Sequence, residues 1–348
     1  MTRTRLSFIV LVILSLSCNR QPRSGTQTSN DQRQAKNAPF EEDKSPHTVH
    51  FVTADNNVKS EVLDWGGSGR ALVLLAGLGD TAHVYDEFAT KLTGAYHVYG
   101  ITRRGFGASS VPDSGYSADR LGDDVLAVID SLRLTRPILV GHSIAGEELS
   151  SVGSRHPEKV AGLVYLEAAY FYAYYDASRG NLTLDALDVQ RKLDQLQSGR
   201  GPTDQRVLRE LLNGDLPQLQ KDLKGTVKDL EGAPPPSQPP PEPPPSSEFS
   251  PTQEILHGMQ KYTKISVPVL AIQAFPRRLG PEEVGDDPAS RDAYKAKMLK
   301  LVGAQIKAFR SGVPYARVIT LPDADHYIYR SNEADVLREI NSFVSSLK

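Results

Sequence analysis

Short apolar runs alternate with longer segments of helical periodicity along most of the chain, from His47 to the C-terminus. A run of four to eight apolar residues between turn-forming residues is typical of a buried strand, whereas apolar residues at every third or fourth position predict an amphipathic helix. Regular alternation of the two favours a largely parallel sheet flanked by helices, an α/β fold. Eight strands are predicted, over residues 47–53, 59–65, 71–77, 97–101, 137–141, 161–167, 267–272 and 316–321.

Helices are predicted between these strands, over residues 82–92, 117–134, 145–156 and 332–347. The alternation breaks once, over residues 170–264, which we interpret as a helical cap inserted into the α/β core. The core would then comprise residues 47–169 and 265–348. Within the cap, residues 234–245 are rich in proline, which lacks an amide donor and fixes its own backbone torsion. This segment is therefore predicted to be a stiff polyproline spacer on the surface.

The N-terminal residues carry a different pattern, with a basic start, an apolar run of twelve residues and a polar stretch. Twelve apolar residues are too few to span a bilayer, so residues 1–17 are predicted to be an export signal. Cys18 is the only cysteine, which excludes an intramolecular disulfide, and the stretch "SLSC" resembles a bacterial lipoprotein signal. The resemblance implies a lipidated Cys18, a disordered tether over residues 18–46, and membrane anchoring in the periplasm or at the cell surface. Simple secretion is the alternative.

Composition limits the classes of function. The 348 residues are 39% hydrophobic, enough for a sizeable core, and the net charge of −2 with no long basic run gives no electrostatic basis for nucleic-acid binding. We therefore expect a small-molecule substrate. The eight histidines show no metal-ligand spacing, so neither a metal nor an organic cofactor is expected. The sequence does not indicate an oligomeric state.

The stretch "VGHSIAG" contains the first candidate for chemistry, Ser143, between a predicted strand and a predicted helix. This is the setting of a nucleophile elbow, a strained turn that requires small residues two positions away on each side, here Gly141 and Ala145. A serine is a weak nucleophile unless a base takes its proton and an acid orients that base. The alternative is a serine that only caps a helix.

Two backbone amides are candidates for an oxyanion hole. The turn "AGLGD" follows the third predicted strand, where such a site is built, and places Leu78 after a glycine. The second donor would be the amide of Ile144, directly after the proposed nucleophile.

Four segments, "LLAGLGD", "ITRRGFGASS", "VGHSIAG" and "LPDADHYIYRSNEADVLREINSFV", together resemble the α/β-hydrolase fold superfamily. The resemblance extends from about His47 to Lys348 and implies an eight-stranded, mostly parallel sheet with a helical cap. It also implies that His326, in the loop after the last strand, is the base. Ala76 stands where relatives commonly carry a histidine, and that histidine is largely structural in the family.

The orienting acid departs from the family pattern. Relatives usually carry an aspartate just after the seventh strand, but residues 273–275 read "QAF". Glu167, at the end of the sixth strand, is the preferred substitute, because some relatives, including a branch of the haloalkane dehalogenases, take their acid from this place. Two alternatives are open: that no acid is present, or that it comes from the loop residues Glu282, Glu283, Asp286 and Asp287.

These features predict a serine hydrolase that cleaves a small carboxylic ester through an acyl-enzyme on Ser143. The alternatives are a cofactor-free haloperoxidase or lyase with the same residues, and a non-catalytic ligand-binding protein on the same scaffold. Dehalogenation is not expected, because it needs an aspartate nucleophile where Ser143 stands. Arg103 and Arg104 are expected to fix loops, and the aromatic residues 170–175 to pack the cap and line an apolar pocket.

Overall fold

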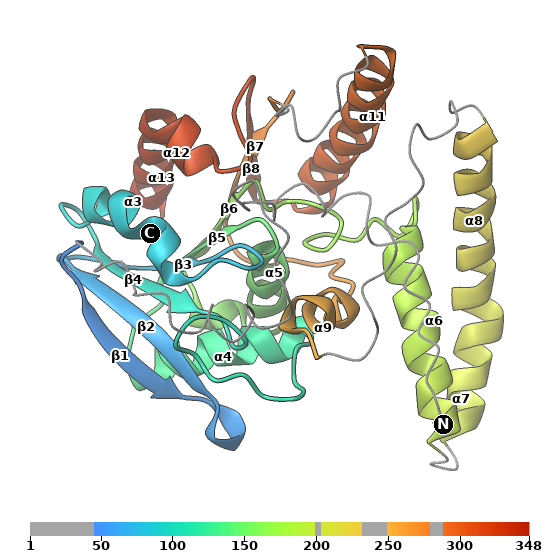
Figure 1. Cartoon of the computed structure of the whole chain (residues 1–348), viewed down its shortest axis with the longest axis horizontal. Helices are drawn as coiled ribbons and strands as arrows, with labels where there is room; N and C mark the ends of the chain where they lie inside the picture. The colour runs from blue at the N-terminus through green and yellow to red at the C-terminus, as the bar shows by residue number, and fades with distance from the viewer. Residues whose placement is uncertain (1–44, 199–202, 232–248, 279–287, 348) are drawn as a thin grey trace, which may run out of the picture.

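The computed structural model describes residues 45–198, 203–231, 249–278 and 288–347. Its centre is an eight-stranded sheet in the order β1-β2-β4-β3-β5-β6-β7-β8 (Figure 1). β2 runs antiparallel to its two neighbours, β1 and β4, and all other neighbouring strands are parallel. The eight predicted strands and the α/β fold class are thereby confirmed. The strand bounds are Thr48–Thr53, Lys59–Gly66, Ala71–Leu75, His97–Thr102, Ile138–His142, Gly162–Leu166, Val269–Ala274 and Ala316–Leu321 for β1 to β8 in chain order.

The inner strands read as nearly continuous apolar runs because helices cover both faces of the sheet. Every residue of β5, β6 and β7 is buried, whereas β1 at the edge is almost wholly exposed. Parallel strands covered on both sides are expected to lack the alternation of a half-exposed strand.

One face packs against α4 (Ala118–Ser131) and α5 (Ala145–Arg155), and the other against α3 (Asp86–Leu92) and α13 (Glu333–Ser346) (Figure 1). α4 begins at Ser117, whose hydroxyl accepts a hydrogen bond from the Arg120 amide, as expected of an N-cap. The predicted helix 82–92 is in fact a 3-10 turn, η3 (Ala82–Tyr85), followed by α3. Three further short helices lie among the core elements: η2 (Asp55–Asn57), η4 (Pro157–Lys159) and α12 (Ile328–Ser331).

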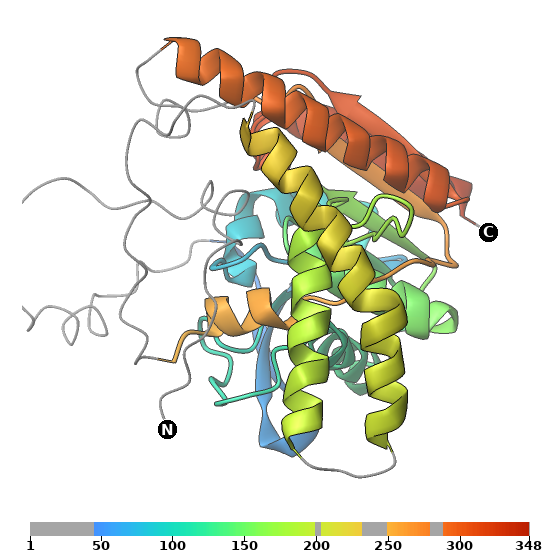
Figure 2. The same cartoon turned by 90° about the vertical axis from the view of Figure 1, so that its right-hand side faces the viewer.

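Helices occupy the interval between β6 and β7, as the interpretation of a cap requires. α6 (Leu182–Gln197) and α8 (Leu216–Glu231) lie side by side, outside the sheet and its covering helices, and are joined through α7 (Thr203–Glu210) and a π-helical turn, η5 (Leu211–Asp215) (Figures 1 and 2). α9 (Pro251–Gly258) leads back toward the core. The polyproline segment 234–245 lies outside the described residues, and the cap boundaries stay a prediction.

α11 (Pro288–Gly312), between β7 and β8, was not predicted from the sequence. Its C-terminal part carries the buried apolar side chains Ile306, Ala308 and Phe309, while its described N-terminal side chains are largely exposed. An amphipathic pattern along the whole helix is therefore absent. Within the described residues, no helix is both long and apolar enough to cross a membrane.

Candidate active site

Ser143 occupies the sharp turn between β5 and α5. Its φ of 53° lies in the left-handed region, which is uncommon for a residue with a side chain. The Ser143 amide donates to the carbonyl of Leu166 at 3.2 Å, and the Ser143 carbonyl accepts from the Gly146 amide at 3.0 Å. A Cβ atom on Gly146 would lie 2.1 Å from the Ala168 carbonyl oxygen, closer than real Cβ contacts come. Local strain and a very close backbone approach thus define the turn, as in a nucleophile elbow.

The three side chains predicted to act together lie within hydrogen-bonding range. Nε2 of His326 is 3.0 Å from Oγ of Ser143, and Nδ1 of His326 is 3.3 Å from Oε2 of Glu167. A carboxylate only accepts hydrogen bonds, so the Nδ1 proton of His326 points to Glu167. Nε2 is then the unprotonated nitrogen, free to accept from the Ser143 hydroxyl. The order of the contacts is that of a base held between an acid and a nucleophile.

Glu167 is fully buried, and its carboxylate is satisfied from several sides. Oε1 accepts from the Ala274 amide at 2.7 Å, and Oε2 accepts from the Tyr170 hydroxyl at 2.6 Å as well as facing His326. A buried charge is costly unless it is paired and hydrogen-bonded. These donors therefore make a carboxylate tolerable at the end of β6.

Gln273 stands where relatives of this fold usually carry the acid, and its side chain is completely buried. Its amide oxygen accepts from the backbone amides of Ala168 at 3.1 Å and Ala169 at 3.3 Å. Gln273 thus holds the chain segment that directly follows Glu167. The sequence does not predict this role, because a contact between β7 and the loop after β6 joins residues more than 100 positions apart. The alternative acids Glu282, Glu283, Asp286 and Asp287 lie outside the described residues.

His142, next to Ser143, supports the loop that carries His326. Nε2 of His142 lies 2.9 Å from the backbone carbonyl of His326, and the two rings are 4.6 Å apart. Burial, and secondarily the neighbouring His326, hold the pKa of His142 well below its ordinary value. A carbonyl only accepts, so Nε2 of the neutral His142 is the protonated nitrogen and donates. Sequence analysis missed this role, which the chain position alone does not reveal.

The predicted oxyanion residues come from two segments that meet. Leu78 belongs to the turn after β3, and Ile144 directly follows Ser143 in the elbow. A Cβ atom on Gly77 would lie 2.9 Å from Nδ1 of His142, which places the turn against the end of β5. The same turn is tied to the histidine loop, because the Tyr327 hydroxyl donates to Asp80 at 3.1 Å.

The aromatic stretch after Glu167 contributes to both core and site. Phe171 and Tyr175 belong to the buried apolar cluster on the α5 side of the sheet. Tyr172 is buried beside Ser143. Its burial and the nearby charge of Glu167 raise the pKa of Tyr172 well above its ordinary value, while a hydrogen bond with Ser143 opposes that shift. A neutral phenol therefore adjoins Ser143. Among the described side chains, no group of three potential metal ligands gathers at this site or elsewhere.

Fold and site together define an α/β hydrolase. Residues 72–339 match the model of the Alpha/beta hydrolase family, and the chain belongs to that family. It is 24% identical over 284 residues to a 2-(acetamidomethylene)succinate hydrolase from Mesorhizobium japonicum, covering 80% of this chain and 90% of that protein.

Solved structures show the same fold. An E-2-(acetamidomethylene)succinate hydrolase structure superposes with a TM-score of 0.53 at 18% identity, covering 86% of this chain and 100% of the other. A bromoperoxidase from Bacillus anthracis superposes with a TM-score of 0.51 at 18% identity, covering the same shares.

Proposed function

We propose that this chain is a serine hydrolase that cleaves a small carboxylic ester, or a related acyl bond, through an acyl-enzyme on Ser143. The proposal rests mainly on two contacts: Nδ1 of His326 with Glu167, and Nε2 of His326 with Oγ of Ser143. The strained backbone at Ser143 supports it, because a nucleophile elbow exposes the hydroxyl to an incoming carbonyl.

The reaction follows from the contacts. Nε2 of His326 takes the Ser143 proton while Oγ attacks the carbonyl carbon, and Glu167 stabilises the resulting imidazolium. The amides of Leu78 and Ile144 donate to the oxyanion; removal of one such donor typically costs about 3 kcal/mol. His326 then protonates the departing alcohol. A water molecule, deprotonated by His326, attacks the acyl-enzyme and releases the carboxylic acid. The mechanism requires no metal or organic cofactor.

The substrate class is proposed from two observations. The relative from Mesorhizobium japonicum hydrolyses a small molecule, 2-(acetamidomethylene)succinate, which supports a small substrate here. Tyr170 and Tyr172 contact the triad residues directly and begin the proposed cap. We therefore propose an acyl group with an apolar or aromatic surface that packs on these rings.

Labelling by a fluorophosphonate tests the nucleophile. The wild-type protein should form one covalent adduct on Ser143, and Ser143→Ala should form none while it keeps its melting temperature. A panel of esters and amides with graded acyl length then defines the substrate. Undiminished labelling of Ser143→Ala would contradict the proposal, and a wild type that neither labels nor turns over any substrate would favour a non-catalytic ligand-binding role. Bromination in the presence of peroxide and acetate would instead identify a cofactor-free haloperoxidase.

We also propose that the protein is exported and anchored through a lipid on Cys18, which lies outside the described residues. The support is the sequence alone, a basic and then apolar N-terminus ending in "SLSC". In a bacterial host the protein should partition with membranes, and Cys18→Ser should abolish both the lipid mass and that partitioning. A mature form that lacks the acyl mass and is freely soluble would leave only secretion.

A further inference from the structure

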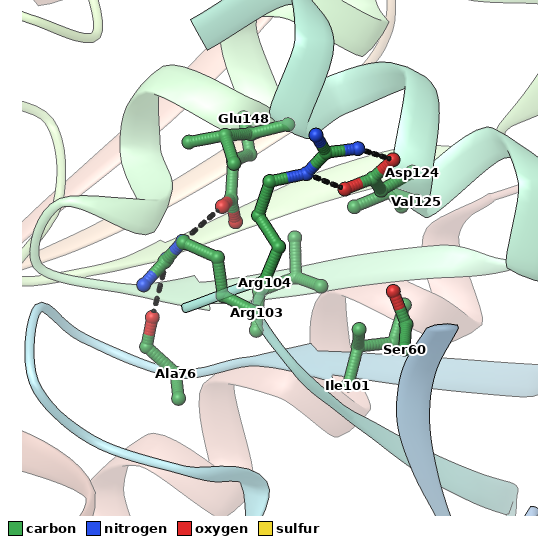
Figure 3. Close-up of a pocket in the computed structure, with 10 residues that line it drawn as sticks. Ser60, Ala76, Ile101, Arg103, Arg104, Asp124, Val125 and Glu148 are labelled. Carbon is green, nitrogen blue, oxygen red and sulfur yellow. Dashed lines mark hydrogen bonds and ion pairs between the residues drawn. The ribbon is translucent and has the colours of Figure 1, made fainter. Parts of the chain in front are cut away.

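Arg103 joins the turn after β3 to the helix that follows the nucleophile. It comes directly after β4, and only 6% of it is exposed. Its Nη2 donates to the Ala76 carbonyl at 2.7 Å and its Nη1 to the Gly77 carbonyl at 3.1 Å. Its Nε donates to Glu148 on α5 (Figure 3). One guanidinium therefore holds two consecutive carbonyls and one carboxylate.

The contact with Gly77 has a geometric consequence for Leu78. The Gly77 carbonyl and the Leu78 amide belong to one peptide unit, which is planar and trans, so C=O and N–H point in opposite directions. A guanidinium that fixes the Gly77 oxygen therefore also fixes the direction of the Leu78 N–H. We infer that Arg103 is a positioning residue that aims the Leu78 amide at the oxyanion. The inference rests on the proposed serine hydrolase function.

Glu148 completes the arrangement from the nucleophile side. It lies on α5, five residues after Ser143, and is as buried as Arg103. A buried guanidinium is costly without a paired charge, and Glu148 supplies that charge. α5 is also the helix that starts at the elbow with Ile144, the second oxyanion donor. The pair thus fixes the two halves of the oxyanion hole relative to each other.

The surroundings of Arg103 argue against a role in binding an acidic substrate. The cavity beside it has room for about one water molecule and is lined by Glu148, Arg104 and Asp124 together with apolar side chains such as Ile101 (Figure 3). The donors of the guanidinium are directed to protein acceptors. This supports the expectation that Arg103 fixes a loop, and identifies the loop as the one that carries Leu78.

Arg104 provides a matched control. It is the next residue, it is equally buried, and it also pairs with a carboxylate, through two hydrogen bonds of 2.6 Å to Asp124 on α4. Its guanidinium is turned toward α4 and away from Ala76 (Figure 3). A lysine at either position keeps the positive charge but lacks the planar fork that reaches several acceptors. Arg103→Lys and Arg104→Lys therefore disturb comparable ion pairs, and only the first disturbs the oxyanion turn.

Steady-state kinetics of the two variants give the first test. Arg103→Lys should lower kcat toward the loss of about 100- to 1000-fold that follows removal of an oxyanion donor, with KM little changed. The affinity for a boronic acid, which mimics the tetrahedral intermediate, should fall with kcat. Arg104→Lys should keep kcat and boronate affinity near wild-type values. Equal losses in both variants, in step with their melting temperatures, would overturn the inference.

Hydrogen exchange supplies a second readout that does not depend on turnover. Exchange of the peptide that contains residues 76–80 should be faster in Arg103→Lys and unchanged in Arg104→Lys. Unchanged exchange in Arg103→Lys would overturn the inference whether or not the protein is a hydrolase. Failure of the wild type to label with fluorophosphonate would instead refute the proposed function, and the exchange of this peptide would still decide whether Arg103 orders the turn.

Discussion

The carboxyl edge of the sheet and the cap helices bury acidic side chains in different ways. At the sheet edge, Glu167 is fully buried and receives hydrogen bonds from a backbone amide and a tyrosine in addition to His326. In the cap, Asp185 on α6 neighbours Asp222 on α8, and burial together with this neighbouring carboxyl group raises the pKa of Asp222 to about 7. At the sheet edge, the hydrogen bonds fix the position of the Glu167 side chain. In the cap, by contrast, the Asp222 carboxyl group changes its charge near neutral pH.

Apolar packing differs between the same two regions. Large buried clusters cover both faces of the sheet. Among the described residues, the helices α6 to α8 share a cluster with three buried members, Val189, Val207 and Leu211, while Leu212 and Val227 in the same region are exposed. Burial of apolar area is the main source of stability. We therefore expect the geometry of the site to be set by the sheet, and the cap to tolerate change.

The largest difference should come from adding one methyl group in each region. Gly146→Ala pushes a Cβ atom against the Ala168 carbonyl at 2.1 Å and should lower the free energy of unfolding by about 1–3 kcal/mol or more. Gly225→Ala, on α8 with open space around it, should raise it by about 0.5–1 kcal/mol through helix propensity. Urea unfolding of both variants measures this. Equal effects would show that the two regions are packed alike.

A smaller difference is expected from two tyrosine hydroxyls of the same aromatic stretch. Tyr170 donates to Glu167 at the sheet edge, and Tyr175 donates to Asp185 in the cap at 2.8 Å. A hydrogen bond to a charged group contributes about 1.5–3 kcal/mol, so Tyr170→Phe should lower kcat by about tenfold. Ala274 still holds the carboxylate in that variant. Tyr175→Phe should leave kcat unchanged, and a comparable loss there would mean that the cap positions the triad.

The smallest effect concerns the pH dependence of the cap. The folded protein retains the Asp222 proton up to about pH 7, whereas the ordinary pKa of an aspartate is 3.8. The resulting contribution to stability is complete below about pH 4 and is lost as the pH rises to about 7. Hydrogen exchange of the α8 amides should therefore speed up between about pH 5 and 8 by more than the chemical pH dependence of amide exchange explains. In Asp222→Asn, this additional acceleration should be absent. The substitution leaves the contacts of Asp185 with Lys261 and Tyr175 unchanged, so the comparison isolates the Asp222 carboxyl group. An identical pH dependence in Asp222→Asn would rule out this carboxyl as the cause.

Local pattern was enough to predict much of this molecule. Ser143 follows β5 as the sequence indicated, because a buried parallel strand is a contiguous apolar run. Strand β8 also falls on its predicted residues, although it lies half-buried at the edge of the sheet. The contacts that make Glu167 tolerable were not predicted. On β7, more than 100 residues away, the Ala274 amide donates to the Glu167 carboxylate, and the Gln273 side chain binds the segment that follows Glu167. The same holds for Arg103, whose role depends on which carbonyls lie beside it.

We propose that Glu167, at the end of β6, replaces the acid that relatives carry after β7. Turnover of an ester by Glu167→Gln tests it most directly, because the amide keeps the shape and removes the charge. An orienting carboxylate is worth on the order of 10⁴ in kcat, so a loss of that size is expected in a folded variant. Asp185→Asn, which neutralises a buried acid of the cap, should cost far less. Near-wild-type turnover in Glu167→Gln would contradict the account and move the search to the loop that follows β7.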